Sequence, residues 1–411
     1  MKCKFCNTTV EKPTFDIGNT AISNDLIPKD RLNSLEKTYP LIFYVCPLCL
    51  LAQTEQYKEG YEIFGDDYVY FSSCSSYWLK HAKQYVEDIT TRLNLGKSSF
   101  VLEIASNDGY LLTNFVEKNI KCLGVEPTRS TAQEAIKKDV PTIVDFFNLE
   151  LASKLEKEGS QADLVIANNV LAHVPDIKNF VASLKKVLKK DGTITIEFPH
   201  LLSIIEKNEF DTIYHEHFFY FSVLALVKIF SKYNLSIYDL DELETHGGSI
   251  RVYVAHTDSN TNKNSDKENL DRILNKEISY GLDTLEYYEK LQHNAFDIKL
   301  NSLQYLIKNK LGGKRIIAFG AAAKGNTFLN YCGIKSDIID AVIDETPYKI
   351  GKYLPQSKIP ILPFSSIKNL KPNVIVILPW NHKEEIINKL EFTKEWGCEI
   401  VIFIPKFEKL Q

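Results

Sequence analysis

Hydrophobic and polar positions change period along most of this chain, and the changes predict strands and helices in turn. Four short apolar runs, SFVLEIA, KCLGVEP, DLVIANN and GTITIEF, have the length of buried strands. Amphipathic stretches with apolar residues at helical spacing lie between them, for instance from Ile177 to Lys190. Because strands and helices alternate at this rhythm, the region predicts a parallel, doubly wound α/β sheet.

The pattern is different at both ends of this region. The first 75 residues contain few helical patterns, which predicts a small N-terminal module. After SIRVYVAH, the polar segment TDSNTNKNSDKEN predicts an exposed loop, and a long helical stretch follows from about Glu268 to Lys310. Alternation restarts with KRIIAFG and continues through IIDAVIDE, NVIVILPW and EIVIFIP. We therefore expect an N-terminal module over 1–75, a central domain with a trailing helical linker over 76–310, and a C-terminal Rossmann-like α/β domain over 311–411.

Charge and composition narrow the classes of partner. The 411 residues carry a formal net charge of −4, so no strong field attracts nucleic acid or an anionic membrane, and neither is expected as a partner. No segment approaches the run of about 18 apolar residues that a membrane helix needs, and the N-terminus lacks a signal-peptide core. We expect a cytoplasmic protein with reduced thiols, either a monomer or a small homo-oligomer.

Four of the eight cysteines form two C-x-x-C pairs. Each pair can direct two thiolates at one cation, and two pairs complete a tetrahedral site of four sulfurs. Because cysteine occupies every position and none is left for water, the predicted ion is a structural zinc. The alternatives are one redox pair beside a coincidental second pair, or two disulfides. The predicted ligands are Cys3, Cys6, Cys46 and Cys49.

The stretch VLEIASNDGYLL stands where a nucleotide-binding fold places its first strand and turn. Such a turn needs small or flexible residues, so that the backbone can approach the ligand before a helix begins. Only one glycine is present, with alanine, serine and asparagine at the other close positions. The next strand ends at Glu126, 23 residues after Glu103, where a carboxylate can bind both ribose hydroxyls. The predicted cofactor-binding residues here are Glu103, Ala105, Ser106, Asn107, Gly109 and Glu126.

Further polar residues follow the next predicted strands. Asp145 is placed to reach an adenine amino group, and Asn168, Asn169 and His173 follow a strand in ADLVIANNVLAHVPD. An NAD-binding fold makes similar demands. The combined pattern favours S-adenosylmethionine, because DLVIANNVLAHVPD looks like the fourth motif of class I methyltransferases. Asp108 and Asp176 are interpreted as helix-capping or turn residues.

The stretch DTIYHEHFFYFS permits three interpretations: a metal site, a proton-transfer site or an aromatic strand that carries histidines by chance. His215 and His217 would point the same way on a strand and apart on a helix. The metalloprotease spacing H-E-x-x-H is absent. Histidine titrates close to neutral pH, so proton transfer is the interpretation that the residue types favour.

In the C-terminal region, AFGAAAKGNTF predicts a strand, a turn of small residues and a helix. Such a turn can bind a phosphate through backbone N–H groups, with charge from Lys324 and hydrogen bonds from Asn326 and Thr327. Tight packing of a helix on the sheet would also explain the small residues from Gly320 to Ala323.

Taken together and in this order, these motifs resemble the three-domain, zinc-containing sugar C-methyltransferases that act on nucleotide-linked deoxysugars. The resemblance covers nearly the whole chain and includes the four-cysteine module, EIASNDGYLL, NNVLAHVPD, YHEHFFYFS, GGSIRVYV and GAAAKGNTFLNY. It implies zinc at the N-terminal cysteines, S-adenosylmethionine in the central domain, and methylation of C3 of a 4-keto sugar linked to thymidine diphosphate.

The resemblance also implies roles for single residues. His217 would be the base that removes the C3 proton, and the C-terminal domain would help to hold the nucleotide. A tyrosine at the edge of the N-terminal module would join the pocket, and DDYVYFSS offers two candidates. The residues implied for catalysis are His217, Tyr214, Glu216, His173, Tyr70 and Tyr68.

Two other functions fit the same scaffold. O- or N-methylation of a nucleotide sugar would need a base but no enolate site. A non-catalytic, zinc-containing nucleotide-binding protein would need neither, and the glycine-poor turn ASNDG is compatible with it.

Overall fold

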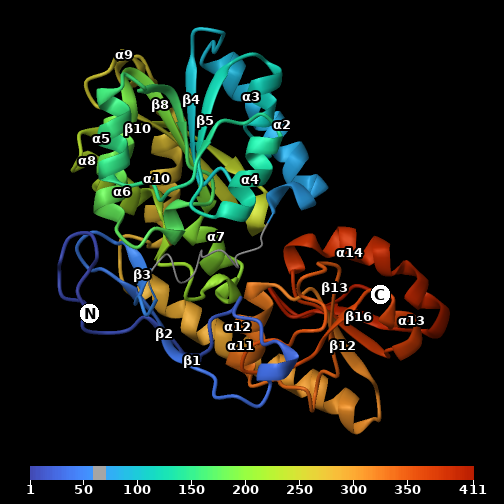
Figure 1. The fold of residues 1–411 in the computed structure, drawn as a ribbon. Coiled ribbons are helices and arrows are strands. Elements are labelled where there is room, and N and C mark those ends of the chain that lie inside the picture. The colour runs from blue at the N-terminus through green and yellow to red at the C-terminus, as the bar shows by residue number, and fades with distance from the viewer. Residues whose placement is uncertain (59–70) are drawn as a thin grey trace.

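The N-terminal module is built on a small antiparallel sheet. The computed structural model describes residues 1–58 and 71–411, and Figure 1 shows their arrangement. The sheet has the order β1-β2-β3-β9, and its fourth strand comes from the segment that directly follows His217. The module therefore shares a sheet with the central part of the chain. The strands are β1 (Phe15–Thr20), β2 (Tyr39–Val45), β3 (Ala52–Thr54) and β9 (Phe219–Tyr220).

The central sheet has seven strands in the order β10-β11-β8-β7-β4-β5-β6. The five strands from β8 to β6 are parallel, as expected, but β11 pairs antiparallel with both β8 and β10, so the sheet is mixed. A short connection joins β10 to β11, and such a connection permits an antiparallel pair but no parallel crossover. The strands are β4 (Phe100–Ile104), β5 (Lys121–Val125), β6 (Thr142–Ile143), β7 (Ala162–Ile166), β8 (Leu188–Pro199), β10 (Leu235–Leu243) and β11 (Ser249–His256).

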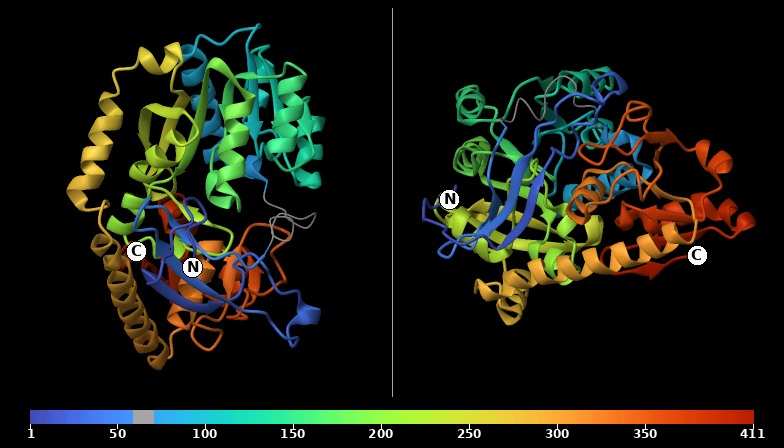
Figure 2. Two further views of the ribbon diagram at one scale, coloured as in Figure 1. Left: turned by 90° about the vertical axis from the view of Figure 1, so that its left-hand side faces the viewer. Right: turned by 90° about the horizontal axis from the view of Figure 1, so that it is seen from below.

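Helices cover both faces of this sheet (Figures 1 and 2). The helices of this part of the chain are α2 (Ser76–Arg92), α3 (Thr113–Glu117), α4 (Arg129–Lys137), α5 (Leu149–Lys157), α6 (Ile177–Val187), α7 (Leu201–Glu206), α8 (Val223–Ser231), α9 (Asn260–Lys263) and α10 (Glu268–Tyr280). The long helix α11 (Glu286–Leu311) packs instead against β1, α7 and the C-terminal domain. The carboxylate of Asp176 accepts hydrogen bonds from the first amides of α6, which confirms its predicted capping role.

Two expectations about the segment after β11 need correction. The polar segment expected to be a loop contains the short helix α9, which begins where the Ser259 hydroxyl accepts a hydrogen bond from the Asn262 amide. The helical stretch expected over 268–310 is two helices, because Gly281 adopts φ 94° and ends α10.

The C-terminal sheet has the order β14-β13-β12-β15-β16-β17, and its pairs are parallel except for the last. Its elements are β12 (Ile316–Phe319), α12 (Ala323–Cys332), β13 (Val342–Asp344), β14 (Ile361–Pro363), α13 (Ser366–Leu370), β15 (Val374–Ile377), α14 (Lys383–Leu390), β16 (Glu399–Ile402) and β17 (Glu408–Lys409). The α/β fold class with three parts is therefore confirmed, and the boundaries at residues 75 and 310 stay predictions.

The N-terminal sheet packs into a core that it shares with the rest of the molecule. Phe15 of β1 contacts both Phe210, which precedes the histidine-rich turn, and Tyr331 of α12, with ring centroids 6.1 and 5.7 Å apart. Phe210 and Tyr331 also contact each other at 5.1 Å. One aromatic side chain from each of the three parts thus meets at a single point. Within residues 1–58 and 71–411, no helix has the length and apolar character to cross a bilayer.

Candidate active site and structural metal centre

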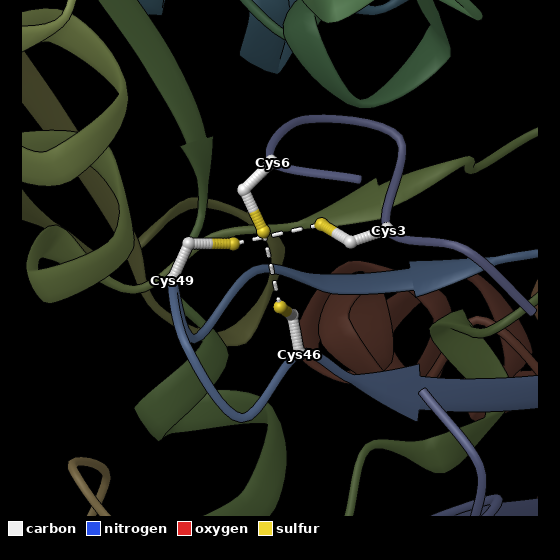
Figure 3. A group of neighbouring side chains, drawn as sticks. All are labelled: Cys3, Cys6, Cys46 and Cys49. Atoms are coloured by element: carbon white, nitrogen blue, oxygen red, sulfur yellow. Dashed lines mark hydrogen bonds between the residues drawn. The ribbon is translucent and has the colours of Figure 1, made fainter. Parts of the chain in front are cut away.

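The four paired cysteines meet at one point in the N-terminal module (Figure 3). The Sγ atoms of Cys3 and Cys49 are 3.6 Å apart, those of Cys6 and Cys46 are 3.4 Å apart, and all four lie within 4.8 Å of one another. Zn–S bonds of about 2.3 Å in a tetrahedron place sulfurs about 3.8 Å apart. The four thiols therefore fit a zinc ion closely, as predicted.

Backbone geometry brings the sulfurs together in both pairs. The amide of Asn7 donates to the Cys3 carbonyl, and the amide of Leu50 donates to the Cys46 carbonyl. Asn7 and Leu50, each directly after the second cysteine of its pair, share the same left-handed φ of 63°. The two C-x-x-C segments are thus matching turns, which is the arrangement that a closed, structural site needs.

The sequence Tyr214–His217 forms a tight turn in which the His217 amide donates to the Tyr214 carbonyl at 2.9 Å. It is neither the strand nor the helix considered from the sequence, and its side chains diverge. His217 is partly exposed and contacts His173 and the partly exposed Tyr214, whereas His215 and Glu216 are buried and contact the N-terminal module. The turn therefore presents one imidazole and one phenol on its accessible side.

Hydrogen bonds define the proton positions on His217. Its Nδ1 lies 3.0 Å from the Thr212 carbonyl, which can only accept, so Nδ1 carries the proton. Its Nε2 lies 2.8 Å from the Tyr214 hydroxyl and holds the ring's lone pair. Burial lowers the pKa of His217 well below its usual value, and His173 adds to this effect. The imidazole is therefore neutral at pH 7, the form that can accept a proton.

His173 packs edge-on against His217, with ring centroids 4.6 Å apart. Its Nδ1 donates to the Glu216 carbonyl at 2.8 Å, and burial lowers its pKa despite that bond. The amide of Phe218 also donates to the Ala172 carbonyl at 2.7 Å. These contacts join the histidine-rich turn to the loop that follows β7.

The buried pair of the turn contacts the N-terminal module. The Glu216 carboxylate accepts hydrogen bonds from the backbone and side-chain nitrogens of Asn24, both at 3.2 Å. His215 donates through Nε2 to the Pro40 carbonyl at 3.2 Å. Glu216 is thus beside His217 in sequence, but its carboxylate ties the turn to the module. Tyr68 and Tyr70 lie outside the described residues.

The turn after β4 has the shape expected for close approach of a ligand to the backbone. Ala105, Asn107 and Gly109 adopt φ values of 53°, 50° and 74°, a region that L side chains rarely occupy. Two buried polar atoms in this part of the chain, Glu103 Oε2 and Ser106 Oγ, have no hydrogen-bond partner among the residues that the structure describes. Both features indicate a binding surface at this turn.

Glu126 lies beside this turn at the end of β5. Its Oε2 accepts from the Asn107 amide and its Oε1 from the Thr128 amide, both at 2.9 Å. Burial raises the pKa of Glu126 despite these bonds. The side chains of Thr128 and Thr131 also hydrogen-bond to this carboxylate, so ribose hydroxyls would compete with them for its oxygens.

The ends of β6 and β7 complete this edge of the sheet. Asn168 follows β7, and its buried Oδ1 has no partner among residues 1–58 and 71–411. Asp145 follows β6, is exposed and accepts a hydrogen bond from the Phe146 amide at 2.7 Å. Since β4, β5, β6 and β7 are neighbouring parallel strands, their carboxyl ends gather all the predicted cofactor-binding residues at one edge. The carboxylate, hydroxyl and amide groups of these side chains fit an adenosyl cofactor.

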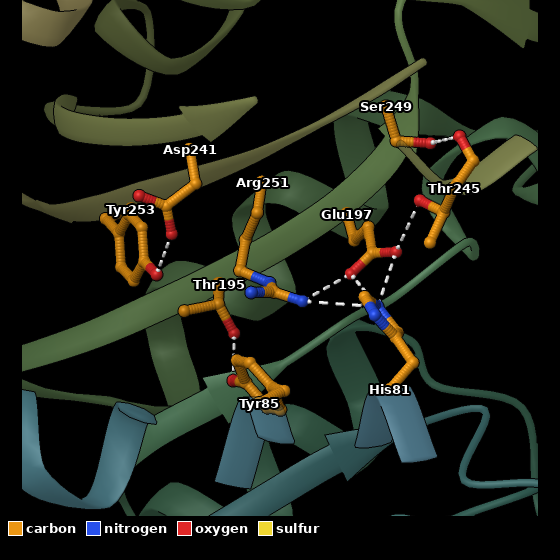
Figure 4. Close-up of polar contacts among 9 residues, drawn as sticks. All are labelled: His81, Tyr85, Thr195, Glu197, Asp241, Thr245, Ser249, Arg251 and Tyr253. Carbon is orange, nitrogen blue, oxygen red and sulfur yellow. Dashed lines mark hydrogen bonds and ion pairs between the residues drawn. The ribbon is translucent and has the colours of Figure 1, made fainter. Parts of the chain in front are cut away.

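A buried charge network that the sequence did not reveal lies at the end of β8 (Figure 4). Glu197 is fully buried, and its carboxylate accepts from Arg251 at 2.6 Å and lies 3.0 Å from His81 Nε2. Burial would raise the pKa of Glu197, but the His81 hydrogen bond and the Arg251 charge outweigh it and lower the pKa to about 2. The Arg251 guanidinium also stacks 4.3 Å from the Tyr85 ring centroid. Because these groups come from β8, β11 and α2, no local sequence motif predicts the network.

In the C-terminal domain, the three predicted substrate-binding residues lie at the start of α12. Lys324 donates to Asn381 at 3.0 Å and lies 4.5 Å above the Trp380 ring. Asn326 is fully buried, and both its side-chain polar atoms lack a partner within the described part of the chain. Thr327 Oγ1 lies 3.3 Å from the Ser23 hydroxyl and so contacts the N-terminal module.

Packing explains part of the small-residue pattern before α12. A Cβ on Gly320, which has φ 89°, would lie 2.4 Å from Pro379, and one on Gly325 would lie 2.7 Å from Leu378. The Ala321 amide already donates to Asp344 at 2.8 Å. Both glycines are therefore required by the approach of the chain after β15, whether or not a phosphate binds nearby.

Comparison with known protein families assigns each part of the chain. Residues 3–64 match the model of a zinc binding domain, residues 78–240 match a methyltransferase domain, and residues 244–405 match a C-methyltransferase C-terminal domain. These matches agree with a structural zinc ion and S-adenosylmethionine as the two expected cofactors.

Individual relatives were also found. The C-methyltransferase NovU of Streptomyces niveus is 29% identical over 405 residues, which cover 98% of this chain and 96% of NovU. Among solved structures, magnesium protoporphyrin IX methyltransferase of Synechocystis PCC 6803 with bound SAM is 16% identical over 47% of this chain and 88% of its own, with a TM-score of 0.33. The PH0226 protein of Pyrococcus horikoshii OT3 is 13% identical over 49% of this chain and 99% of its own, with a TM-score of 0.36.

Proposed function

Because this chain belongs to the three-domain, zinc-containing C-methyltransferases, we propose that it methylates C3 of a nucleotide-linked 4-keto-deoxysugar. S-adenosylmethionine, when bound at the edge formed by β4 to β7, supplies an electrophilic methyl group. The nucleotide is a thymidine diphosphate by the resemblance of the sequence motifs.

His217 is the base in this proposal. A proton on the carbon beside a ketone becomes acidic only when the resulting enolate is stabilised. The Nε2 lone pair of His217 takes the C3 proton, while the other proton stays on Nδ1, which donates to the Thr212 carbonyl. The Tyr214 hydroxyl, which donates to Nε2 at 2.8 Å without substrate, turns to the C4 oxygen when the sugar binds and so frees the Nε2 lone pair and stabilises the enolate.

His173 and Glu216 have positioning roles. The edge of the His173 ring holds the His217 ring in place, and His173 is itself fixed by the Glu216 carbonyl. The Glu216 carboxylate anchors the turn to Asn24 of the N-terminal module. A tyrosine of DDYVYFSS, either Tyr68 or Tyr70, is proposed to complete the site.

One observation carries the proposal: the loop after β7 contains both a predicted cofactor-binding residue and a histidine that contacts the proposed base. Asn168, at the carboxyl end of the parallel strands, precedes His173 by five residues, and His173 contacts His217 directly. A neutral imidazole beside a phenol thus lies next to the place where a methyl donor would bind. O- or N-methylation would also need a base, but it forms no enolate and so gives no role to the Tyr214 hydroxyl as a hydrogen-bond donor.

In the C-terminal domain, Lys324 and Asn326 are proposed to act on the nucleotide's phosphates. Lys324 supplies a positive charge at the start of α12, and Asn326 has unpartnered polar atoms within the described residues. Thr327 supports this end of α12 through Ser23.

The position of the transferred methyl group tests the proposal. S-adenosylmethionine with a ¹³C-labelled methyl group is incubated with the protein and a thymidine-diphosphate-linked 4-keto-deoxysugar, and the product is analysed by NMR. We expect the labelled methyl group to be bonded to C3 of the sugar ring, in place of the C3 proton. A label bonded to oxygen or nitrogen would support the alternative methyl transfers, and binding of both ligands without any transfer would support a non-catalytic protein.

A further inference from the structure

A short 3-10 helix, Phe210–Thr212, lies just before the histidine-rich turn, and its last residue accepts the hydrogen bond from Nδ1–H of His217. All three residues are buried, and Phe210 packs against Phe15 and Tyr331 from the other two parts of the molecule. The helix therefore stands where the three parts meet. Its position depends on contacts from outside the central domain.

The C-terminal domain makes a directed contact with this helix through Trp380. The indole Nε1–H donates to Asp211 Oδ2 at 2.8 Å, and Asp211 is 1% exposed. Lys324 lies 4.5 Å above the same indole and faces the same acidic group. Burial raises the pKa of Asp211 to about 6, while the Lys324 charge and the Trp380 hydrogen bond act in the opposite direction. Within the part of the chain that the structure describes, this indole is the only side-chain hydrogen-bond donor to the buried carboxylate, which therefore depends on it to stay in place.

Thr212, the residue after Asp211, links the position of this helix to His217. The Thr212 carbonyl accepts a hydrogen bond from the Nδ1–H of His217 at 3.0 Å, and the Thr212 hydroxyl donates to the Glu209 carbonyl at 2.7 Å. If the helix shifts, the carbonyl moves away from Nδ1, and the imidazole is free to rotate or to place its proton on Nε2. In either case the lone pair no longer points at the site.

We propose that Trp380 is a positioning residue for His217: its hydrogen bond to Asp211 fixes the Thr212 carbonyl, which keeps the base in the tautomer with a lone pair on Nε2. The C-terminal domain thus contributes to proton abstraction as well as to substrate binding. The inference rests on the proposed function insofar as His217 is the base, but the tautomer itself can be observed without substrate.

Two substitutions break the contact from its two sides. Trp380→Phe retains an aromatic ring and removes the donor, and Asp211→Leu removes the acceptor while it keeps the branched shape of the side chain. Trp396→Phe is the matched control, because Trp396 also lies in the C-terminal domain and donates its indole N–H to a carbonyl, that of Pro372, at 2.9 Å. Thermal unfolding establishes which variants are folded. If Trp380→Phe is unfolded, Asp211→Leu is used for the test.

The first readout is ¹⁵N NMR of the full chain labelled at histidine, with the His217 signals identified by their loss in His217→Gln. We expect the Nδ1–H tautomer in the unaltered protein and in Trp396→Phe, and a mixture of tautomers in Trp380→Phe and Asp211→Leu. An unchanged His217 spectrum in both contact variants would overturn the proposal.

The second readout is exchange of the C3 proton of the 4-keto sugar nucleotide with deuterated water. We expect kcat for exchange to fall about tenfold in each contact variant, with KM within about twofold, and the double variant to be no slower than the single ones. Losses that multiply in the double variant would show that Trp380 does not act through Asp211. If the unaltered protein shows no exchange while the tautomer still responds, the role of His217 as the base fails and the positioning by Trp380 stands.

Discussion

The phenol of Tyr214 donates to Nε2 of His217 at 2.8 Å, and the two rings lie 4.0 Å apart between centroids. The same histidine donates through Nδ1 to a backbone carbonyl. The ring is therefore held at both nitrogens, and its neutral tautomer is selected before any substrate binds. This arrangement suits a base that must receive one proton at one atom.

Replacement of Tyr214 tests the role of the phenol. In Tyr214→Phe, we expect the rate of C3 proton exchange to fall about tenfold or more, because the enolate oxygen loses a donor while the base remains. Tyr238→Phe is the control, since the Tyr238 hydroxyl bonds to Thr193 inside the central sheet. Equal exchange rates in the two variants would contradict the assignment of Tyr214.

The zinc site should be necessary for a stable fold. We expect about one zinc ion per chain by metal analysis, and Cys46→Ala should lose it and unfold at a lower temperature. The physical reason is that the N-terminal sheet shares its core with its neighbours and has little of its own. Cys332→Ala, which removes a buried thiol in α12, should retain the metal. A folded preparation with under about half an equivalent of zinc would contradict the prediction.

The buried Glu197 should contribute strongly to stability. Glu197→Gln leaves Arg251 without its charge partner, and we expect the free energy of unfolding to fall by about 3 kcal/mol. The control is Glu242→Gln, because Glu242 pairs with Arg272 and Lys276 at the surface and should cost less than about 1 kcal/mol. Urea unfolding at pH 7 measures both, and similar losses for the two variants would contradict the prediction.

Stability should also fall in mild acid because of His246. Burial and the Lys324 charge lower the pKa of His246 to about 3 in the folded protein. The unfolded chain therefore binds a proton near pH 6.5 that the folded chain does not, so stability is lost as the pH falls below that value. We expect His246→Asn, which tolerates the left-handed backbone at this position, to reduce the loss between pH 6.5 and 4.5 by about 1–2 kcal/mol.

The control for this pH effect is His293→Gln, since the side chain of His293 is 79% exposed and folding changes its surroundings little. Urea unfolding at several pH values supplies the measurement. An identical pH dependence in His246→Asn and the unaltered protein would refute the assignment.

Local patterns predicted much of this fold. The four cysteines lie together, as the two C-x-x-C spacings predicted. The four buried apolar runs are strands β4, β5, β7 and β8. Both kinds of prediction depend on residues close together in sequence. The antiparallel β10 and β11 were not foreseen, because a continuous apolar run does not state the direction in which a strand pairs.

The features missed from the sequence are those made by distant residues. Glu197, Arg251 and His81 come from three elements, and their spacing gives no periodic signal. Likewise, nothing near Asp211 indicates that its partner is Trp380, 169 residues away. The sequence YHEH carried a chemical signal, but its geometry is a turn, so the different partners of His215 and His217 exclude the strand interpretation without making the segment a helix.

The most direct test of the account is exchange of the C3 proton in deuterated water, with the protein and a 4-keto sugar nucleotide but no methyl donor. We predict that the unaltered protein replaces this proton with deuterium, and that His217→Ala, folded by circular dichroism, does so at least about 100-fold more slowly. Exchange at the full rate in His217→Ala would show that another group is the base.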